Sequence, residues 1–123
     1  MNTVLLVDDS KTILMSLTAI VEKHGYKAVT AVDGALALGL ITSGLRPNVV
    51  VTDLNMPNMD GITFIREARK TPGMKFVPIL MLTTESQQAK RLEAKTAGAT
   101  GWLVKPVGAE SLIDVLKQVL PRS

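Results

Sequence analysis

The sequence of 123 residues contains no cysteine, which excludes a disulfide framework and any thiolate chemistry. It also has no apolar run close to the ~20 residues that a membrane-spanning helix needs. The first apolar segment, at residues 4–7, is far too short for a secretion signal. Because an absence of cysteine fits a reducing compartment, we expect a cytoplasmic protein without membrane insertion.

Aromatic residues and histidine are scarce, with one Trp, one Tyr, two Phe and one His. With no cysteine and only His24 as a nitrogen ligand, the sequence does not favour a zinc site. The formal net charge of +3 invites a nucleic-acid hypothesis, but the basic residues are scattered and no DNA-binding motif is present. We therefore expect no nucleic-acid partner.

Short apolar segments recur along the chain and are typical of strands. Runs without polar alternation indicate strands that are buried on both faces, as in a parallel sheet covered by helices. The expected strands are Val4–Val7, Lys27–Ala31, Val49–Asp53, Pro78–Leu82 and Gly101–Val104.

Amphipathic stretches separate these strands and predict helices. Ser10 is a candidate N-cap of the first helix, and Gly25 is its stop signal. The expected helices are Ser10–His24, Ala35–Leu45, Asp60–Lys70, Ser86–Ala97 and Ala109–Leu120. The alternation predicts one domain, residues 1–123, with a three-layer doubly wound (βα)5 flavodoxin-like α/β sandwich and a parallel sheet of order 2-1-3-4-5.

Two of the expected helices have unusual compositions. The stretch Ala35–Leu45 carries no charge, so it is either a deeply packed helix or an apolar patch that docks on a partner or a second copy. The stretch Ser86–Ala97 has an apolar face of little more than Ala89, Leu92 and Ala97. A helix that buries so little is weakly held and shifts at low cost.

Polar residues stand at the carboxyl ends of the expected strands. Because parallel strands all end at the same edge of a sheet, these side chains should meet where the strand order reverses. They are Asp8 and Asp9 after the first strand, Asp53 on the third, Thr83 on the fourth and Lys105 on the fifth.

Three carboxylates in one place repel one another unless a cation lies among them, and few protein ligands with several waters suit Mg²⁺. Taken alone, the pair Asp8 and Asp9 would be read as a helix cap or a solvated turn. Recurrence of polar residues at the same edge favours a phosphoryl-transfer site instead. Asp53 is then the nucleophile that forms an acyl phosphate, while Lys105 and Thr83 contact phosphoryl oxygens.

Four segments make the chain similar to a known family. The chain resembles the bacterial response-regulator receiver family over its whole length, and within it the single-domain chemotaxis regulators. The segments are VDDS at 7–10, TDLNMPNMDG at 52–61, LTTE at 82–85 and AGATGWLVKP at 97–106.

The resemblance implies roles around the metal. Asp53 would be the phosphoacceptor, Asp9 and Asp53 direct Mg²⁺ ligands, and Asp8 a ligand through water. The backbone carbonyl of Asn55 would complete the protein ligands, and Mn²⁺ would substitute for Mg²⁺. Asn55 and Glu85 stand at the positions that set the rate at which the family removes its own phosphoryl group.

The resemblance also implies a switch. Thr83 would turn towards the phosphoryl group, Lys105 would pair with it, and the Lys105–Pro106 bond would be cis. Trp102 matches the switch aromatic of the last strand, although an aromatic residue near a strand end also serves simply for packing. The expected partner face joins the fourth helix, the fifth strand and the fifth helix. Its candidate contacts are Lys90, Arg91, Lys95, Trp102 and Lys117, which are otherwise a solvated face.

The expected function is that of a phosphoacceptor signalling protein in a two-component system, a monomer that catalyses only its own phosphorylation and dephosphorylation. The resemblance implies a CheA-type histidine kinase as donor and, with no output domain expected, the flagellar motor switch as a diffusible target. The alternative within the family is a single-domain phosphorelay shuttle or phosphate sink. From another class, a Mg²⁺-dependent phosphatase would want a second Asp two residues after Asp53, where Asn55 stands.

Overall fold

The computed structural model describes residues 2–84 and 88–120. Its sheet has five parallel strands in the order β2-β1-β3-β4-β5, which confirms the predicted doubly wound fold. The strands are β1 (Thr3–Val7), β2 (Lys27–Ala31), β3 (Val49–Asp53), β4 (Ile79–Thr83) and β5 (Gly101–Val104).

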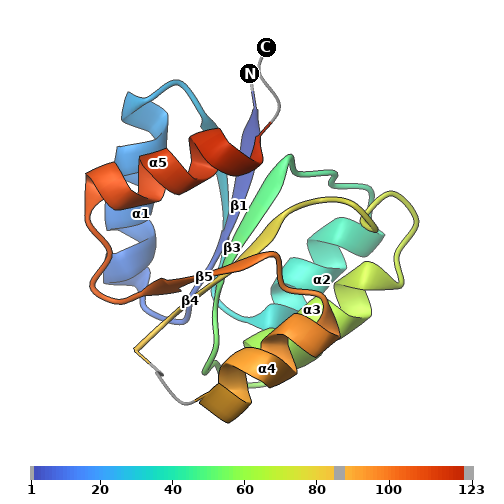
Figure 1. The fold of residues 1–123 in the computed structure, drawn as a ribbon. Helices are drawn as coiled ribbons and strands as arrows, with labels where there is room; N and C mark the ends of the chain where they lie inside the picture. Colours follow the sequence, from blue (N-terminus) through green and yellow to red (C-terminus); the bar gives the residue numbers. More distant parts are fainter. Residues whose placement is uncertain (1, 85–87, 121–123) are drawn as a thin grey trace.

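Helices cover both faces of the sheet. Helices α1 and α5 lie on one face, and α2, α3 and α4 lie on the other (Figure 1). Each face has its own cluster of buried apolar side chains, because residues alternate between the faces along every strand. The helices are α1 (Lys11–Lys23), α2 (Gly34–Thr42), α3 (Gly61–Arg69), α4 (Gln88–Ala97) and α5 (Ala109–Val119).

Side-chain caps start three of the helices. The expected cap Ser10 accepts a hydrogen bond from the Ile13 N–H at 3.3 Å. Asp33 and Asp60 cap α2 and α3 in the same way. These caps fix where each strand-to-helix loop ends, and two of those loops border the candidate site.

Helix α2 is shorter than predicted. It ends at Thr42 rather than Leu45, because Gly44 takes a φ of 117° and the chain turns there. Ala37 and Ile41 are fully buried, whereas Leu36 is 54% exposed and Leu40 36% exposed. The interpretation as a deeply packed helix therefore holds for one side of α2 only.

Helix α4 is weakly buried, as predicted, but through another residue. Ala94 is its one buried side chain, whereas Leu92 is 61% exposed and Ala89 is also exposed. The predicted face was therefore wrong at Ala89 and Leu92, which face outwards because Ala94 takes the buried position, whereas Ala97 is half-buried and packs against the core. The predicted start at Ser86 lies outside the described residues.

None of the helices in residues 2–84 and 88–120 combines the length and hydropathy that a membrane span requires.

Candidate functional site

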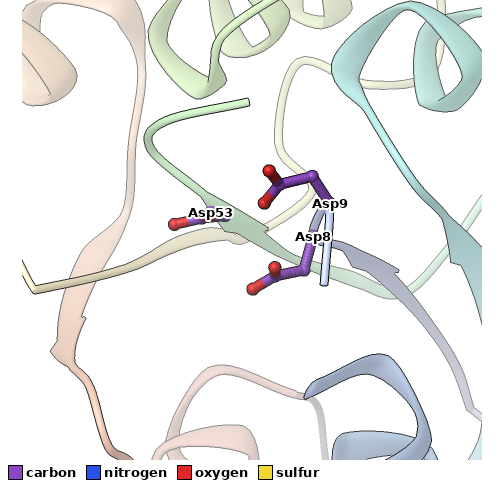
Figure 2. Close-up of side chains that lie close together, drawn as sticks. All are labelled: Asp8, Asp9 and Asp53. Carbon is purple, nitrogen blue, oxygen red and sulfur yellow. The ribbon is translucent and has the colours of Figure 1, made fainter. Parts of the chain in front are cut away.

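Three carboxylates meet at the carboxyl edge of the sheet. Asp53 is the last residue of β3, and Asp8 and Asp9 directly follow β1, the neighbouring strand. One oxygen of each carboxylate lies within 4.8 Å of the others, and Figure 2 shows the three groups around a common space. Asp8 is 1% exposed and Asp53 is 7% exposed, while Asp9 faces solvent.

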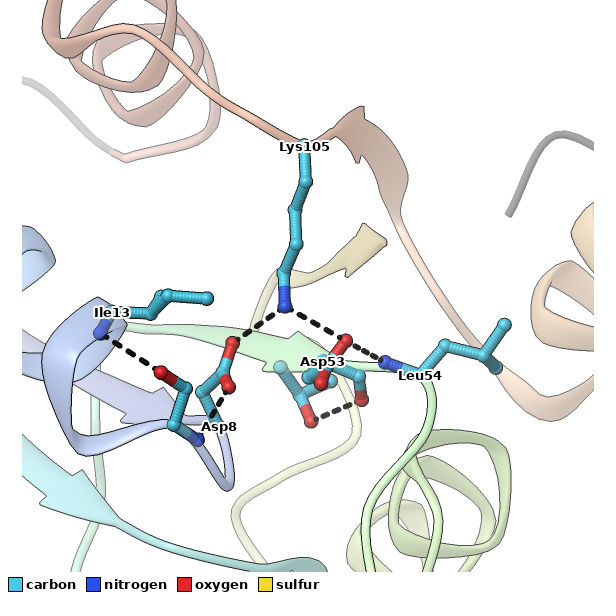
Figure 3. A network of polar contacts seen from close by, with 7 residues as sticks. Asp8, Ile13, Asp53, Leu54 and Lys105 are labelled. Carbon is cyan, nitrogen blue, oxygen red and sulfur yellow. Dashed lines mark hydrogen bonds and ion pairs between the residues drawn. The ribbon is translucent and has the colours of Figure 1, made fainter. Parts of the chain in front are cut away.

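Lys105, the residue directly after β5, contacts the carboxylate cluster with its side chain. Its Nζ lies 2.9 Å from Asp8 Oδ2 and 3.3 Å from Asp53 Oδ1, as Figure 3 shows. Backbone donors hold the same carboxylates: the Ser10 N–H donates to Asp8 Oδ1 and the Leu54 N–H to Asp53 Oδ1, both at 2.9 Å. The loops after β1 and β3 thus orient the carboxylates towards the lysine.

The environment of Asp53 disfavours its charged form. Burial raises the pKa of Asp53 above its ordinary value, and the neighbouring charge of Asp8 raises it further. Lys105 opposes both effects by ion pairing and hydrogen bonding. Burial lowers the pKa of Lys105, but its bonds to Asp8 and Asp53 outweigh that effect, and its pKa is raised.

Thr83 lies at the same edge, where it ends β4 with 1% of its surface exposed. The Lys105 N–H donates to the Thr83 carbonyl at 2.9 Å, so the chain following β5 stays beside β4 as it enters the site. The Lys105–Pro106 peptide bond is cis, as the resemblance implied. The structure therefore brings Thr83 and Lys105 to the edge that the carboxylates occupy.

Trp102 lies on β5 and packs against the core on the α2–α3–α4 face. Its indole N–H is buried and has no hydrogen-bond partner among the described residues. Arg91 of α4 covers the ring, with Cζ 5.2 Å from the ring centroid. This stacking joins the weakly buried helix directly to the strand that leads to Lys105.

The other predicted surface residues take up separate places. Lys90 pairs with Glu93 at 3.6 Å on α4, and Lys95 and Lys117 are exposed. Asn55 is exposed in the loop after β3. Glu85 lies outside the described residues.

Two anchoring residues were not predicted from the sequence. Asp33, in the turn after β2, accepts a hydrogen bond at 2.8 Å from Asn58 in the loop after β3. Arg69 at the end of α3 donates to backbone carbonyls of the loop before β4 and of Gly98 after α4. Asp33 could have been found as an Asp-Gly helix start, whereas its partner is 25 residues away in the chain.

The donor set suits a hard divalent cation. Carboxylate oxygens are the ligands that Mg²⁺ prefers, and the exposure of Asp9 leaves one side of the cluster accessible to water. A cation there would offset the repulsion between Asp8 and Asp53, which Lys105 and the Leu54 N–H offset only in part.

Comparison with known proteins agrees with this geometry. The family model of the response regulator receiver domain matches residues 4–117. The chain therefore belongs to the response-regulator receiver family.

Among its relatives are two proteins of Pseudomonas aeruginosa. "Protein PilH" is 34% identical over 95% of this chain and 96% of its own length. "Chemotaxis protein CheY" is 34% identical over 97% of this chain and 96% of its own. The chain is thus a CheY-like response regulator receiver with chemotaxis-type homologues.

Solved structures agree. CheY4 of Vibrio cholerae superposes with a TM-score of 0.93 and 44% identity, covering 98% of this chain and 99% of its own. The receiver domain of a Pseudomonas aeruginosa sensor histidine kinase superposes with a TM-score of 0.88 and 27% identity, covering 96% of both chains. That neighbour has a magnesium ion coordinated in its active-site cleft.

Proposed function

We propose that this chain accepts a phosphoryl group from a histidine kinase on Asp53 in a Mg²⁺-dependent reaction. The observation that carries the proposal is the position of the Asp53 carboxylate, which is nearly buried, contacts Lys105 and lies beside Asp8 and Asp9. The raised pKa of Asp53 means that its surroundings do not fully stabilise the charged carboxylate. Such a group gains from a bound cation.

The residues divide the chemistry among themselves. An Asp53 oxygen attacks phosphorus, the bond to the kinase histidine breaks, and an acyl phosphate forms. Asp9 and Asp53 would bind Mg²⁺ directly, with Asp8 through water and the Asn55 carbonyl as a further ligand. When bound, Mg²⁺ or Mn²⁺ would neutralise charge on the phosphoryl oxygens.

Lys105 starts bonded to Asp8 and Asp53, so its ammonium is already in place to contact a phosphoryl oxygen on Asp53. The protein acts on no external substrate in this proposal. It catalyses only its own phosphorylation and dephosphorylation, with Asn55 and Glu85 setting the rate of phosphoryl loss.

Output would follow from a population shift. A phosphoryl group on Asp53 would attract Thr83, and Trp102 and α4 would move with it. Weak burial of α4, with Ala94 alone buried, supports a low cost for that movement. The partner face would be formed by Lys90, Arg91, Lys95, Trp102 and Lys117.

A CheA-type kinase as donor and the flagellar motor switch as target fit best, because chemotaxis regulators recur among the relatives. A phosphorelay shuttle or phosphate sink is the alternative. A peptide from the motor switch should bind more tightly after phosphorylation, and unchanged affinity would favour the alternative.

Mass spectrometry tests the phosphoacceptor. Incubation with Mg²⁺ and a small acyl phosphate should add one phosphoryl group, and Asp53→Asn should abolish the adduct. Asp60→Asn is the matched control, because Asp60 caps α3 and is absent from the carboxylate cluster. An adduct that survives Asp53→Asn would refute the assignment, as would turnover of phosphomonoesters without an adduct.

A further inference from the structure

The loop between β3 and α3, residues 54–60, is hydrogen-bonded to the turn that follows β2. Asp33 lies in that turn and uses both carboxylate oxygens. Oδ1 accepts from the Leu36 N–H at 2.8 Å and caps α2, while Oδ2 accepts from Asn58 Nδ2 at 2.8 Å. One buried carboxylate, 6% exposed, thus holds a helix start and the loop after Asp53 together.

Backbone contacts bring the same two segments close together. The Gly34 N–H donates to the Met59 carbonyl at 3.3 Å. A Cβ on Gly34 would lie only 2.6 Å from that carbonyl oxygen, so the approach requires glycine. The turn after β2 and the loop after β3 are therefore packed backbone to backbone beside the site.

The backbone conformation of Asn58 suits its hydrogen bond to Asp33. Its φ of 68° lies in the left-handed region, which asparagine tolerates better than most residues. Asn58 is an exposed residue, yet its side chain donates a hydrogen bond to Asp33. The pKa of Asp33 is held below its ordinary value, mainly by the hydrogen bond from the Leu36 N–H and next by the one from Asn58. Asp33 is therefore an ionised acceptor at neutral pH.

The ends of the loop are fixed independently. The Gly61 N–H donates to the Leu54 carbonyl at 2.8 Å, and Asp60 caps α3 through the Thr63 N–H at 2.7 Å. These bonds close the loop but do not fix its position relative to β1. The bond from Asn58 to Asp33 supplies that link through side chains, beside the backbone bond from Gly34 to Met59, because β2, which precedes Asp33, pairs with β1.

We propose that Asp33 and Asn58 are positioning residues for the metal site, which hold residues 54–60 so that the Asn55 carbonyl faces the carboxylates. This inference rests on the proposed function, since it assumes that Mg²⁺ binds beside Asp53. A loop released from Asp33 samples more conformations, and only a fraction of them is competent to bind the metal. The apparent dissociation constant rises by the inverse of that fraction.

The test is a Mg²⁺ titration of the full chain followed by amide NMR shifts, with far-UV circular dichroism as a check of folding. Asn58→Gly removes the side-chain donor while permitting the positive φ, and it changes no charge. We expect it to raise the Mg²⁺ dissociation constant about 10-fold, the lower end of the range for loss of an outer-shell partner. Asp33→Asn keeps an oxygen to cap α2 but loses the second acceptor, and should act in the same direction.

An exchange of the two residues provides the rescue. Asn58→Asp alone opposes two carboxylates and should weaken Mg²⁺ binding. Combined with Asp33→Asn, it restores one donor and one acceptor with the roles reversed, and the dissociation constant should return to within about twofold of wild type. General loosening of α2 would not produce this recovery.

Arg46→Ala is the matched control for α2. Arg46 donates to the carbonyls of Ile41 and Leu45 at the opposite end of α2, so its loss loosens that helix without touching the loop. Wild-type affinity in Arg46→Ala, with weaker binding in Asn58→Gly, would support the proposal. Equal weakening in both variants, or wild-type affinity in Asn58→Gly, would overturn it. A wild-type chain that binds no Mg²⁺ would overturn the proposed function first, and this inference with it.

Discussion

At the scale of single residues, one lysine offsets the charges of two nearly buried carboxylates. Asp8 and Asp53 are nearly buried next to each other, and Lys105 is bonded to both. Removing the lysine would leave two buried carboxylates without their cation, whereas removing one carboxylate leaves a balanced pair. We therefore expect this cluster of carboxylates to reduce the stability of the metal-free protein.

Asp53→Asn should stabilise the metal-free protein by about 0.5–2 kcal/mol at pH 7, because it removes the carboxylate that burial and Asp8 disfavour. The sign follows from the raised pKa of Asp53: the folded state binds the proton more tightly than the unfolded state. The protonated carboxyl of Asp53 contributes fully to folding stability at pH values below its ordinary pKa of 3.8. This contribution is lost as the pH rises through the raised pKa of the folded state.

Urea denaturation of both proteins without Mg²⁺, from pH 3 to pH 8, measures this. The advantage of Asp53→Asn should grow as pH rises above about 4. A constant difference across that range would show that the charge of Asp53 is fully compensated.

Trp102 is the other residue whose environment makes a prediction. Its indole N–H is buried without a partner among the described residues, and Arg91 stacks on the ring. Arg91→Ala should expose the ring and shift the Trp102 emission to longer wavelength, with a loss of about 0.5–1 kcal/mol of stability. Lys90→Ala is the control, since Lys90 pairs with Glu93 instead. Identical emission in wild type and Arg91→Ala would contradict the stacking.

At the scale of elements, α4 is the least buried helix described, and few contacts anchor it. Ala94 is its buried side chain, and Arg69 of α3 donates to the Gly98 carbonyl just beyond its C-terminus at 2.7 Å. Nearer the N-terminal end of α4, Arg91 adds the stacking contact with Trp102. The sequence predicted the weak burial but not the anchor, because Arg69 and Gly98 are 29 residues apart.

Two glycine substitutions should act in opposite directions on stability. Gly98→Ala forces a Cβ to within 2.9 Å of Arg69 Nε at a φ of 120°, so it should cost about 1–3 kcal/mol. Gly39→Ala lies within α2 with nothing within 4 Å, so it should add about 0.5–1 kcal/mol through helix propensity. Thermal unfolding measures both, and destabilisation by Gly39→Ala would show that the exposed side of α2 is packed.

At the scale of the whole molecule, binding of the proposed Mg²⁺ would be coupled to folding. A ligand that binds only the folded state stabilises it in proportion to the logarithm of its concentration. At ten times its dissociation constant, Mg²⁺ should stabilise the wild-type chain by about 1.4 kcal/mol. Asp53→Asn should lose most of this gain. The difference in stability between the two proteins should therefore narrow, or change sign, as Mg²⁺ is added.

Thermal melts across a Mg²⁺ series measure this coupling, with Ca²⁺ as the comparison ion. An equal rise in melting temperature for the wild type and Asp53→Asn would place the ion elsewhere.

The sequence by itself determined the order of strands and helices and the composition of the site. Apolar runs mark buried strands, and the parallel topology brings Asp8, Asp9, Asp53 and Lys105 to one edge. Only the tertiary structure decided which face α4 buries, where α2 ends and that Asp33 reaches Asn58. Periodicity reports local chemistry, whereas these features depend on contacts between segments distant in the chain, where packing overrides local preference.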